Sequence, residues 1–375
     1  MDIASYRLNE RLAKAAIPSW RLMAIQGPHH FRNVGFPVEI ESADELFNLL
    51  DTMHENRFPR VVAELGGLDE ADITALLDAL VDYCKFYGVN FPGKDAPIPL
   101  STMVAHLAIA RKLRGLGTPK RILEIGPGCG YLSFFLRDWP GLVNYSQIET
   151  AQSFYIFQNL VNKHVFSHRF RDHAQGDWAA HGAARTGMLT GSTDEQRQAA
   201  YETPERLPLG LPVLCHHYPW WRIDEVAEQQ FDVVTSNANF NEFSEGALLQ
   251  YVRLIDRCLA QEGCLLIQDM GGGALPLETI KRELADIGLA PVVATLPSAS
   301  VIGSKSFAAT NYLFVRRQHP SFGKYAATQR EWPLFDPTDP LVRDVYLPRS
   351  SAGRRSLSPG DILQALAGRL EAERR

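Results

Sequence analysis

Residues 120–150 read KRILEIGPGCGYLSFFLRDWPGLVNYSQIET, and this stretch decides the fold. The apolar run at 121–125 predicts a buried strand, which leads directly into three glycines within 126–130. Apolar and aromatic residues at 131–139 predict a helix, and a second predicted strand at 143–149 ends on Glu149. A strand, a glycine turn, a helix and a second strand closed by a carboxylate form one half of a Rossmann-type nucleotide site.

The spacing of the glycines distinguishes between kinds of nucleotide. Dinucleotide sites have the pattern G-x-G-x-x-G, with a helix N-terminus directed at a pyrophosphate. This chain has G-x-G-x-G at 126–130, preceded by Glu124, and its next glycine is Gly141. Glycines let the backbone turn sharply and approach a ligand closely, because a Cβ there would collide with the ligand. We expect Glu149, at the end of the second strand, to bind the two ribose hydroxyls.

The pattern E-x-G-x-G-x-G resembles motif I of the class I S-adenosylmethionine (SAM) methyltransferases; the alternative is an ordinary βα turn of another α/β protein. The resemblance implies that the chain binds SAM, releases S-adenosylhomocysteine (SAH), and has Glu124 near the cationic end of the ligand. It also implies that Asn237 lies nearest the sulfonium. The flat face of adenine suits an aromatic neighbour, so we expect Tyr218 or Trp220 to flank it, the alternative being that the tryptophans simply pack. The expected cofactor-binding residues are Glu124, Gly126, Pro127, Gly128, Gly130, Glu149, Thr150, Gln152, Tyr218, Trp220 and Asn237.

Three further segments resemble one subgroup of that family, named for sugar O-methyltransferases. They are I-E-T-x-Q-x-F-Y-x-x-Q-N at 148–159, H-x-x-W-W at 217–221 and S-N-x-x-x-N-E-x-S at 236–244. The resemblance implies methyl transfer to a hydroxyl of a small molecule, such as a sugar or a natural-product intermediate. Two alternatives stay open. One is an N-methyltransferase of a small amine, although its usual N/D-P-P-Y/F loop is absent; the other is a SAM-binding protein that serves non-methyl transfer or regulation.

The alternation of strands and helices predicts an α/β fold with a Rossmann-like seven-stranded sheet, mostly parallel with an antiparallel strand 7. We expect residues 1–115 to form a helical addition for substrate binding, a lid or oligomerisation. Residues 116–317 are expected to form the SAM-binding core, and 318–375 a C-terminal extension. The polar, Gly-rich segment 165–210 is expected to be an insertion before strand 3, which we assign to 212–217.

Helix N-caps are predicted at four positions that precede apolar runs with helical spacing: Asp69, Ser101, Thr150 and Ser244. The resemblance implies that the helix beginning at Ser101 crosses the mouth of the cofactor site. His106 lies on that helix, and we expect it to be partly buried and bonded to the backbone rather than catalytic.

Composition narrows the class of protein. Apolar residues make up 45% of the chain and charged residues 22%, which is ordinary for a globular protein. No apolar run reaches the length of about 20 residues that a membrane span needs, and the N-terminus has no secretory pattern. Five scattered cysteines indicate reduced thiols in a cytoplasm. The net charge of −5 argues against nucleic acid as a partner. The arginine-bearing residues 316–375 suggest a solvated or subunit-contacting face, as in a homodimer.

Methyl transfer to a hydroxyl needs positioning and a base. The base candidates are His216 and His217 at the end of strand 3 and Glu242 after strand 4, which we expect at 231–236. A histidine suits the role because its ordinary pKa is near neutrality, although adjacent residues of a strand point to opposite faces. Metal dependence is disfavoured, because the loop after strand 4 offers asparagines and only Asp269 is in place at the end of strand 5, which we expect at 263–270.

Overall fold

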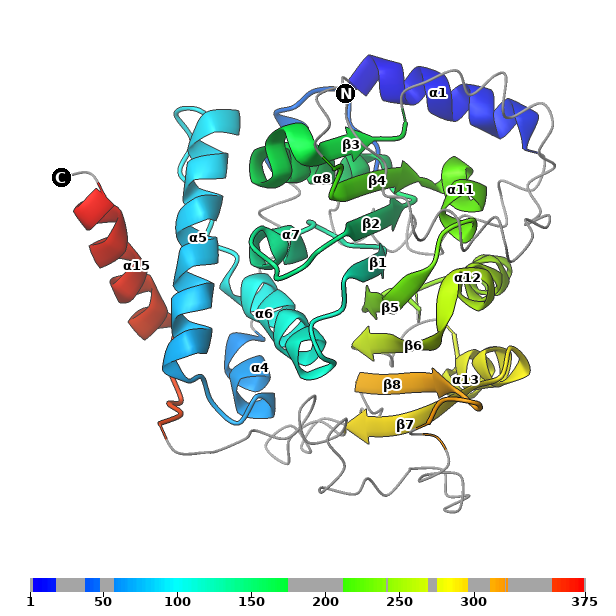
Figure 1. Ribbon diagram of the computed structural model, residues 1–375. Helices are drawn as coiled ribbons and strands as arrows, with labels where there is room; N and C mark the ends of the chain where they lie inside the picture. Colours follow the sequence, from blue (N-terminus) through cyan, green and yellow to red (C-terminus); the bar gives the residue numbers. More distant parts are fainter. Residues whose placement is uncertain are drawn as a thin grey trace.

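The computed structural model describes residues 3–17, 38–47, 57–174, 212–240, 242–268, 275–295, 311–320, 322 and 353–373. Its centre is one eight-stranded sheet in the order β3-β4-β2-β1-β5-β6-β8-β7 (Figure 1). The strands are β1 Arg121–Ile125, β2 Asn144–Glu149, β3 Phe170–Asp172, β4 Cys215–Pro219, β5 Phe231–Asn237, β6 Leu259–Gln268, β7 Leu289–Thr295 and β8 Asn311–Arg316. Strands β1 to β6 all pair in parallel, and β8 runs antiparallel between β6 and β7. The predicted α/β class and the antiparallel strand are therefore confirmed.

The eighth strand corrects the prediction for 165–210. Residues up to Phe166 continue a helix, and Phe170–Asp172 then form the edge strand β3, which pairs parallel with β4. A three-residue strand has no detectable alternation, so only its pairing with β4 makes it a strand. The rest of the predicted insertion, residues 175–210, lies outside the described residues. Strand β4 also extends to Pro219, two residues beyond the predicted end of strand 3.

Helices cover both faces of the sheet, with α5 to α8 on one side and α11 to α13 on the other (Figure 1). The described helices are α1 Ile3–Ala16, α4 Phe58–Glu64, α5 Glu70–Asn90, α6 Leu100–Gly115, α7 Leu132–Leu136, α8 Gln152–Phe166, α11 Ile223–Ala227, α12 Glu245–Cys258, α13 Leu277–Asp286 and α15 Pro359–Glu373. Two 3₁₀ turns follow α8 and β4, at Ser167–Arg169 and Trp220–Arg222. Covering helices let a parallel sheet be apolar on both faces, and every residue of β1 is buried.

Two of the four predicted N-caps are confirmed. The Asp69 side chain accepts from the Asp72 backbone N–H at 2.9 Å, and the Asp72 side chain accepts from the Asp69 N–H, which is a capping box. The Ser244 hydroxyl accepts from the Ala247 N–H at 3.1 Å at the start of α12. Both caps stand directly before apolar residues that recur at helical spacing, so local sequence is enough to define the helix start.

The caps predicted at Ser101 and Thr150 are wrong. Helix α6 begins one residue before Ser101, and the Ser101 hydroxyl accepts from the Arg57 and Phe58 N–H groups at the start of α4, at 3.1 Å each. Ser101 therefore joins two helices rather than capping its own. Helix α8 begins after Ala151, because the Glu149 carboxylate accepts the N–H groups of Thr150 and Ala151 and fixes the chain before the helix.

The N- and C-terminal segments join the same apolar core as the sheet. Buried Tyr83 and Phe86 of α5 belong to one cluster with β1, and so do Ile362 and Leu366 of α15. Helix α15 lies beside α5 (Figure 1), and Arg369 forms an ion pair with Asp78 there. Before α15, Arg354 donates to the Leu65 carbonyl at 2.8 Å. Residues 353–373 of the C-terminal extension thus pack on the N-terminal helices.

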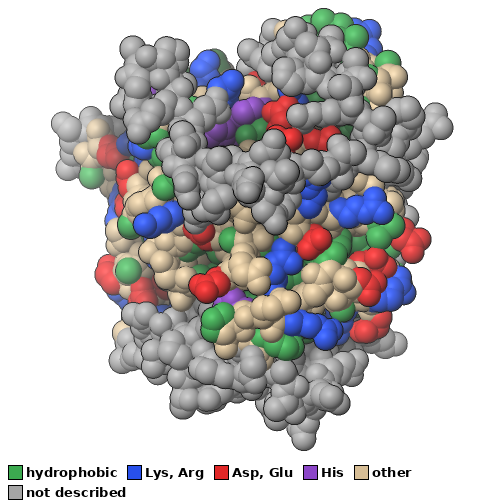
Figure 2. Space-filling model, turned by 45° about the vertical axis from the view of Figure 1, so that its right-hand side comes forward, with side chains coloured by type: hydrophobic (Ala, Val, Ile, Leu, Met, Phe, Trp, Pro, Cys, Tyr) green, Lys and Arg blue, Asp and Glu red, His purple; other side chains and the backbone are tan. Residues whose placement is uncertain are grey.

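The described helices, surface charges and cysteines can be compared with the expectations from composition. Within the described residues, none of the helices combines the length and the apolar character needed to cross a membrane. On the face drawn in Figure 2, acidic and basic side chains of the described residues are interspersed rather than gathered by sign. All five cysteines are free thiols, and four of them are buried.

Candidate functional site

The glycine loop leaves β1 at Ile125 and enters α7 at Leu132. Gly126, Gly128 and Gly130 have φ values of 61°, 58° and 71°, a region that other residues rarely adopt. A Cβ on Gly126 would lie 2.4 Å from Oδ1 of Asn239, and one on Gly130 would lie 3.1 Å from Cγ of Gln158. A Cβ on Gly128 would meet no described atom within 4 Å. Neighbouring side chains thus leave little room for a Cβ at Gly126 and Gly130, whereas Gly128 faces open space.

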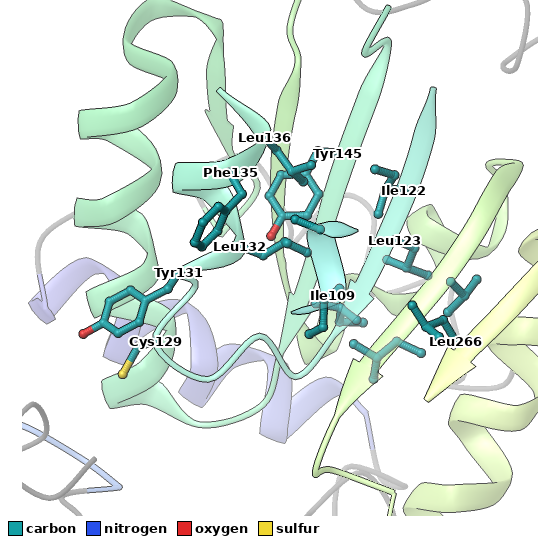
Figure 3. Packing of buried hydrophobic residues seen from close by; sticks show 14 of the residues in the cluster. Ile109, Ile122, Leu123, Cys129, Tyr131, Leu132, Phe135, Leu136, Tyr145 and Leu266 are labelled. Atoms are coloured by element: carbon teal, nitrogen blue, oxygen red, sulfur yellow. The ribbon is translucent and has the colours of Figure 1, made fainter. Parts of the chain in front are cut away.

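A buried shell of apolar side chains supports this loop from below. Ile122 and Leu123 of β1 belong to one buried cluster with Leu132 of α7, Ile109 of α6 and Leu266 of β6 (Figure 3). Each of these five side chains is fully buried. Close packing of this kind fixes the loop at the carboxyl edge of the sheet, where open α/β sheets bind their ligands.

Glu149 ends β2 beside the loop, and its carboxylate is almost completely buried. Its Oε1 accepts from the Thr150 N–H at 2.7 Å and from the Ala151 N–H at 2.9 Å. Its Oε2 accepts from Nε2 of Gln158 at 2.9 Å. Burial raises the pKa of Glu149, and these hydrogen bonds act in the opposite direction because they stabilise the charged form.

The other acid of the site, Glu124, lies on β1 below the loop and is 1% exposed. Its Oε2 accepts from the Tyr145 hydroxyl and, at 3.4 Å, from Nε2 of Gln147. A further chain of bonds runs from Gln147 to Asn162 and from Asn162 to Ser133 on α7. Burial raises the pKa of Glu124 to about 7. Its Oε1 has no hydrogen-bond partner among the described residues, so a buried acceptor remains open there.

The loop after β5 lies against the glycine loop. Asn239 donates from Nδ2 to the carbonyl oxygens of Gly126 and Asn237, both at 2.7 Å. Ala238, between the two asparagines, has φ 58°, which is uncommon for a residue other than glycine. Oδ1 of Asn237 is buried, and no described group bonds to it. Asn239 was not predicted; only its neighbour Asn237 stood out in the sequence.

Strand β4 sends its two histidines to opposite faces of the sheet, as the alternation rule predicts. His217 contacts α8, where its Nδ1 pairs with Asn159 and its Nε2 with Gln158. His216 contacts Nε2 of His173 at 3.0 Å on the other face. Burial lowers the pKa of His216 to about 4 and lowers that of His217 well below its ordinary value, so both are neutral at pH 7.

Three of the residues expected to bind the cofactor, Tyr218, Trp220 and Gln152, contact other protein groups in the structure. The Tyr218 hydroxyl accepts from Nε2 of Gln229 at 2.8 Å, and its ring stacks on His173 with centroids 3.9 Å apart. Trp220 is 4% exposed and packs edge-on against Trp221. Gln152 accepts from the Ile40 N–H at 2.9 Å and so holds the described segment 38–40 against the start of α8.

The remaining candidates lie around the carboxyl edge. Glu242 is half-buried in the turn before α12, and its N–H donates to the Asn239 carbonyl at 2.9 Å. Asp269 lies outside the described residues. His106 is buried and pairs through Nδ1 with the Thr102 carbonyl at 2.7 Å, which confirms the backbone-bonded interpretation. The described residues contain no group of three or more His, Cys, Asp or Glu side chains that fits a metal ion.

Comparison with known proteins gives structural similarities only. No protein-family model matches the sequence, and no curated protein sequence matches it. A magnesium protoporphyrin IX methyltransferase from Synechocystis PCC 6803 with bound SAH aligns with 63% of this chain and 93% of its own, at 10% identity and a TM-score of 0.36. A TehB-like SAM-dependent methyltransferase from Corynebacterium glutamicum aligns over 64% and 97%, at 12% identity and a TM-score of 0.34. An SAH-bound methyltransferase from Podospora anserina aligns over 64% and 88%, at 14% identity and a TM-score of 0.34.

Proposed function

We propose that this chain is a class I SAM-dependent methyltransferase. The observation that supports this most directly is the position of Glu149. Its carboxylate ends β2 beside Gly128, whose side-chain direction, unlike those of Gly126 and Gly130 in the same loop, is open. An acceptor at this position suits two ribose hydroxyls, and an open backbone segment beside it suits close approach of a ligand.

The buried acids fit the two ends of SAM. Glu149 would bind the ribose hydroxyls, while the open Oε1 of Glu124 offers an acceptor below the glycine loop for the cationic end of the ligand. Asn237, at the end of β5, would lie nearest the reacting carbon. When bound, SAM supplies a methyl group that its sulfonium already activates for in-line displacement, so the protein's part is to hold and orient the two reactants.

We further propose that the acceptor is a hydroxyl of a small molecule, such as a sugar or a natural-product intermediate, with Glu242 as the general base. Both ring nitrogens of His217 are engaged by α8, and His216 lies on the opposite face against His173. Glu242 lies on the loop that follows Asn237, the last residue of β5, at the carboxyl edge of the sheet. Ligands of open α/β sheets bind at this edge, so the Glu242 carboxylate would lie near the acceptor hydroxyl and could take its proton.

Calorimetric titration with SAM and SAH tests the class of protein. Both ligands should bind with a stoichiometry of one per chain, and failure of both to bind would contradict the proposal. A panel of hydroxylated acceptors and small amines then tests the acceptor, with SAH release as the measurement. Turnover with the amines and not with the hydroxyl compounds would replace O-methylation with N-methylation and leave the cofactor assignment intact.

A further inference from the structure

Gln158, on α8, connects the two parts of the proposed cofactor site. Its Nε2 donates to the Gly128 carbonyl at 2.5 Å and to Oε2 of Glu149 at 2.9 Å. The side chain is fully buried. An amide nitrogen has two hydrogens, so both are used, one on the glycine loop and one on the second acid.

The orientation of this amide is fixed by a chain of hydrogen bonds that starts at a backbone carbonyl. Nδ2 of Asn159 donates to the Tyr155 carbonyl at 3.2 Å, and the same nitrogen lies 3.0 Å from Nδ1 of His217. A nitrogen that donates to a carbonyl is the NH₂ group, so Nδ1 of His217 must accept. In a neutral imidazole the proton is then on Nε2, which donates to Oε1 of Gln158 at 2.7 Å.

The other end of the chain agrees with this assignment. The Gly128 carbonyl can only accept, so the atom of Gln158 beside it must be the amide nitrogen. Every step between the Tyr155 and Gly128 carbonyls has one donor and one acceptor. The Tyr155 ring also stacks on His217, with centroids 3.9 Å apart, and holds the imidazole plane. Burial lowers the pKa of His217, which keeps it in the neutral form that this chain requires.

We propose that Gln158, oriented by His217, is a positioning residue that sets Glu149 relative to the glycine loop and presents Oε2 of Glu149 to the ribose; this inference rests on the proposed function. Oε1 of Glu149 already accepts two backbone N–H groups. A carboxylate oxygen accepts about two hydrogen bonds. Oε2 accepts from Gln158, and the Thr150 hydroxyl also bonds to the carboxylate, so a ribose hydroxyl would bind Oε2 in competition with the Thr150 hydroxyl.

The amide has a second effect, because it stabilises the charged form of a carboxylate that is otherwise buried. Burial raises the pKa of Glu149, and the hydrogen bond from Gln158 lowers it. Removal of this donor should therefore raise the pKa of Glu149 further. A protonated Glu149 is a poorer acceptor for ribose hydroxyls. Loss of the amide should therefore weaken SAH binding. It should also raise the pH below which SAH affinity falls.

The test uses the full chain and compares Gln158→Met with wild type by calorimetric titration of SAH from pH 5 to pH 8. We expect Kd to rise by about tenfold or more, and the pH at which affinity falls by half to move upward. Gln230→Met is the matched control. Gln230 directly precedes β5, at the amino ends of the parallel strands and therefore away from the glycine loop at their carboxyl ends. Its amide also donates to a backbone carbonyl. Its Kd and pH profile should match wild type.

A Kd within twofold of wild type, with an unshifted pH profile, would overturn the inference. If Gln158→Met does not fold, Gln158→Asn replaces it, because its amide is one methylene shorter and cannot reach both the Gly128 carbonyl and Glu149; the same rise in Kd is expected. Carboxyl NMR titration of Glu149 gives a readout without ligand, and its pKa should rise in either variant. Wild type that fails to bind SAH would contradict the proposed cofactor, whereas an unchanged Glu149 pKa would contradict the role of Gln158.

Discussion

Asn239 lies directly against Gly126: its Nδ2 donates to the Gly126 carbonyl at 2.7 Å, and a Cβ on Gly126 would be 2.4 Å from its Oδ1. The loop after β5 and the glycine loop are therefore packed without room for one methyl group. The glycine at this position is required by contact between two loops of the protein, as well as by its φ of 61°.

Gly126→Ala should lower the free energy of unfolding by about 2–5 kcal/mol, because a left-handed backbone conformation and a steric overlap act together. Gly128→Ala has the same backbone strain in open space, so about 1–2 kcal/mol is expected. Urea denaturation measures both. Equal losses in the two variants would mean that the Asn239 contact does not matter, and Gly126→Ala combined with Asn239→Ala should regain part of the loss.

Glu149→Ala should weaken SAH binding by at least about tenfold, because each hydrogen bond to a charged group contributes about 1.5–3 kcal/mol. Titration calorimetry on the folded variant measures this. Glu245→Ala, in the exposed first turn of α12, is the control and should bind as wild type does. An unchanged affinity in Glu149→Ala would move the ribose site away from the end of β2.

Glu242→Gln should lower kcat by about a hundredfold or more, within the range for loss of a general base. SAH affinity should stay within about twofold, because the carboxylate is proposed to act on the acceptor and not to hold the cofactor. Parallel measurement of turnover and SAH binding separates the two effects. A loss of SAH affinity without a loss of kcat would assign Glu242 to the cofactor site instead.

His106 gives a pH-dependent prediction. Burial lowers its pKa to about 4, while the unfolded chain has a histidine pKa of about 6.5. The unfolded state therefore binds the proton more readily, so His106 contributes stability that is fully present above pH 6.5 and is lost as pH falls toward 4. In His106→Leu, the difference in unfolding free energy between pH 7 and pH 5 should shrink by about 2 kcal/mol. Denaturant titrations at both pH values test this, and an unchanged difference would be contrary to it.

Ser101→Ala should lower the free energy of unfolding by about 1–2 kcal/mol, because two N–H groups at the start of α4 would lose their acceptor. Ser244→Ala removes an ordinary N-cap of α12 and gives the reference loss of about 1 kcal/mol. Urea denaturation compares them. A negligible effect at Ser101, beside a normal effect at Ser244, would show that water replaces the hydroxyl at α4.

Local sequence signals predicted the core of the fold because their physical causes are local. Short strand-like segments between predicted helices indicated β1, β2 and β5. The three glycines indicated the turn, and Asp69 and Ser244 indicated helix starts. The two acids of the candidate site, Glu124 and Glu149, were found in the same way, because each occupies a fixed place in a strand relative to the turn.

Only the tertiary structure decided how those acids are held and which residues complete the site. Strand β3 exists because it pairs with β4, and Ser101 binds α4 because two helices meet there. Gln158 reaches Gly128 and Glu149 from α8, while Asn239 reaches Gly126 from the loop after β5. These contacts join residues far apart in the chain, and a hydrogen bond between two elements depends on their packing, which no single stretch of sequence specifies.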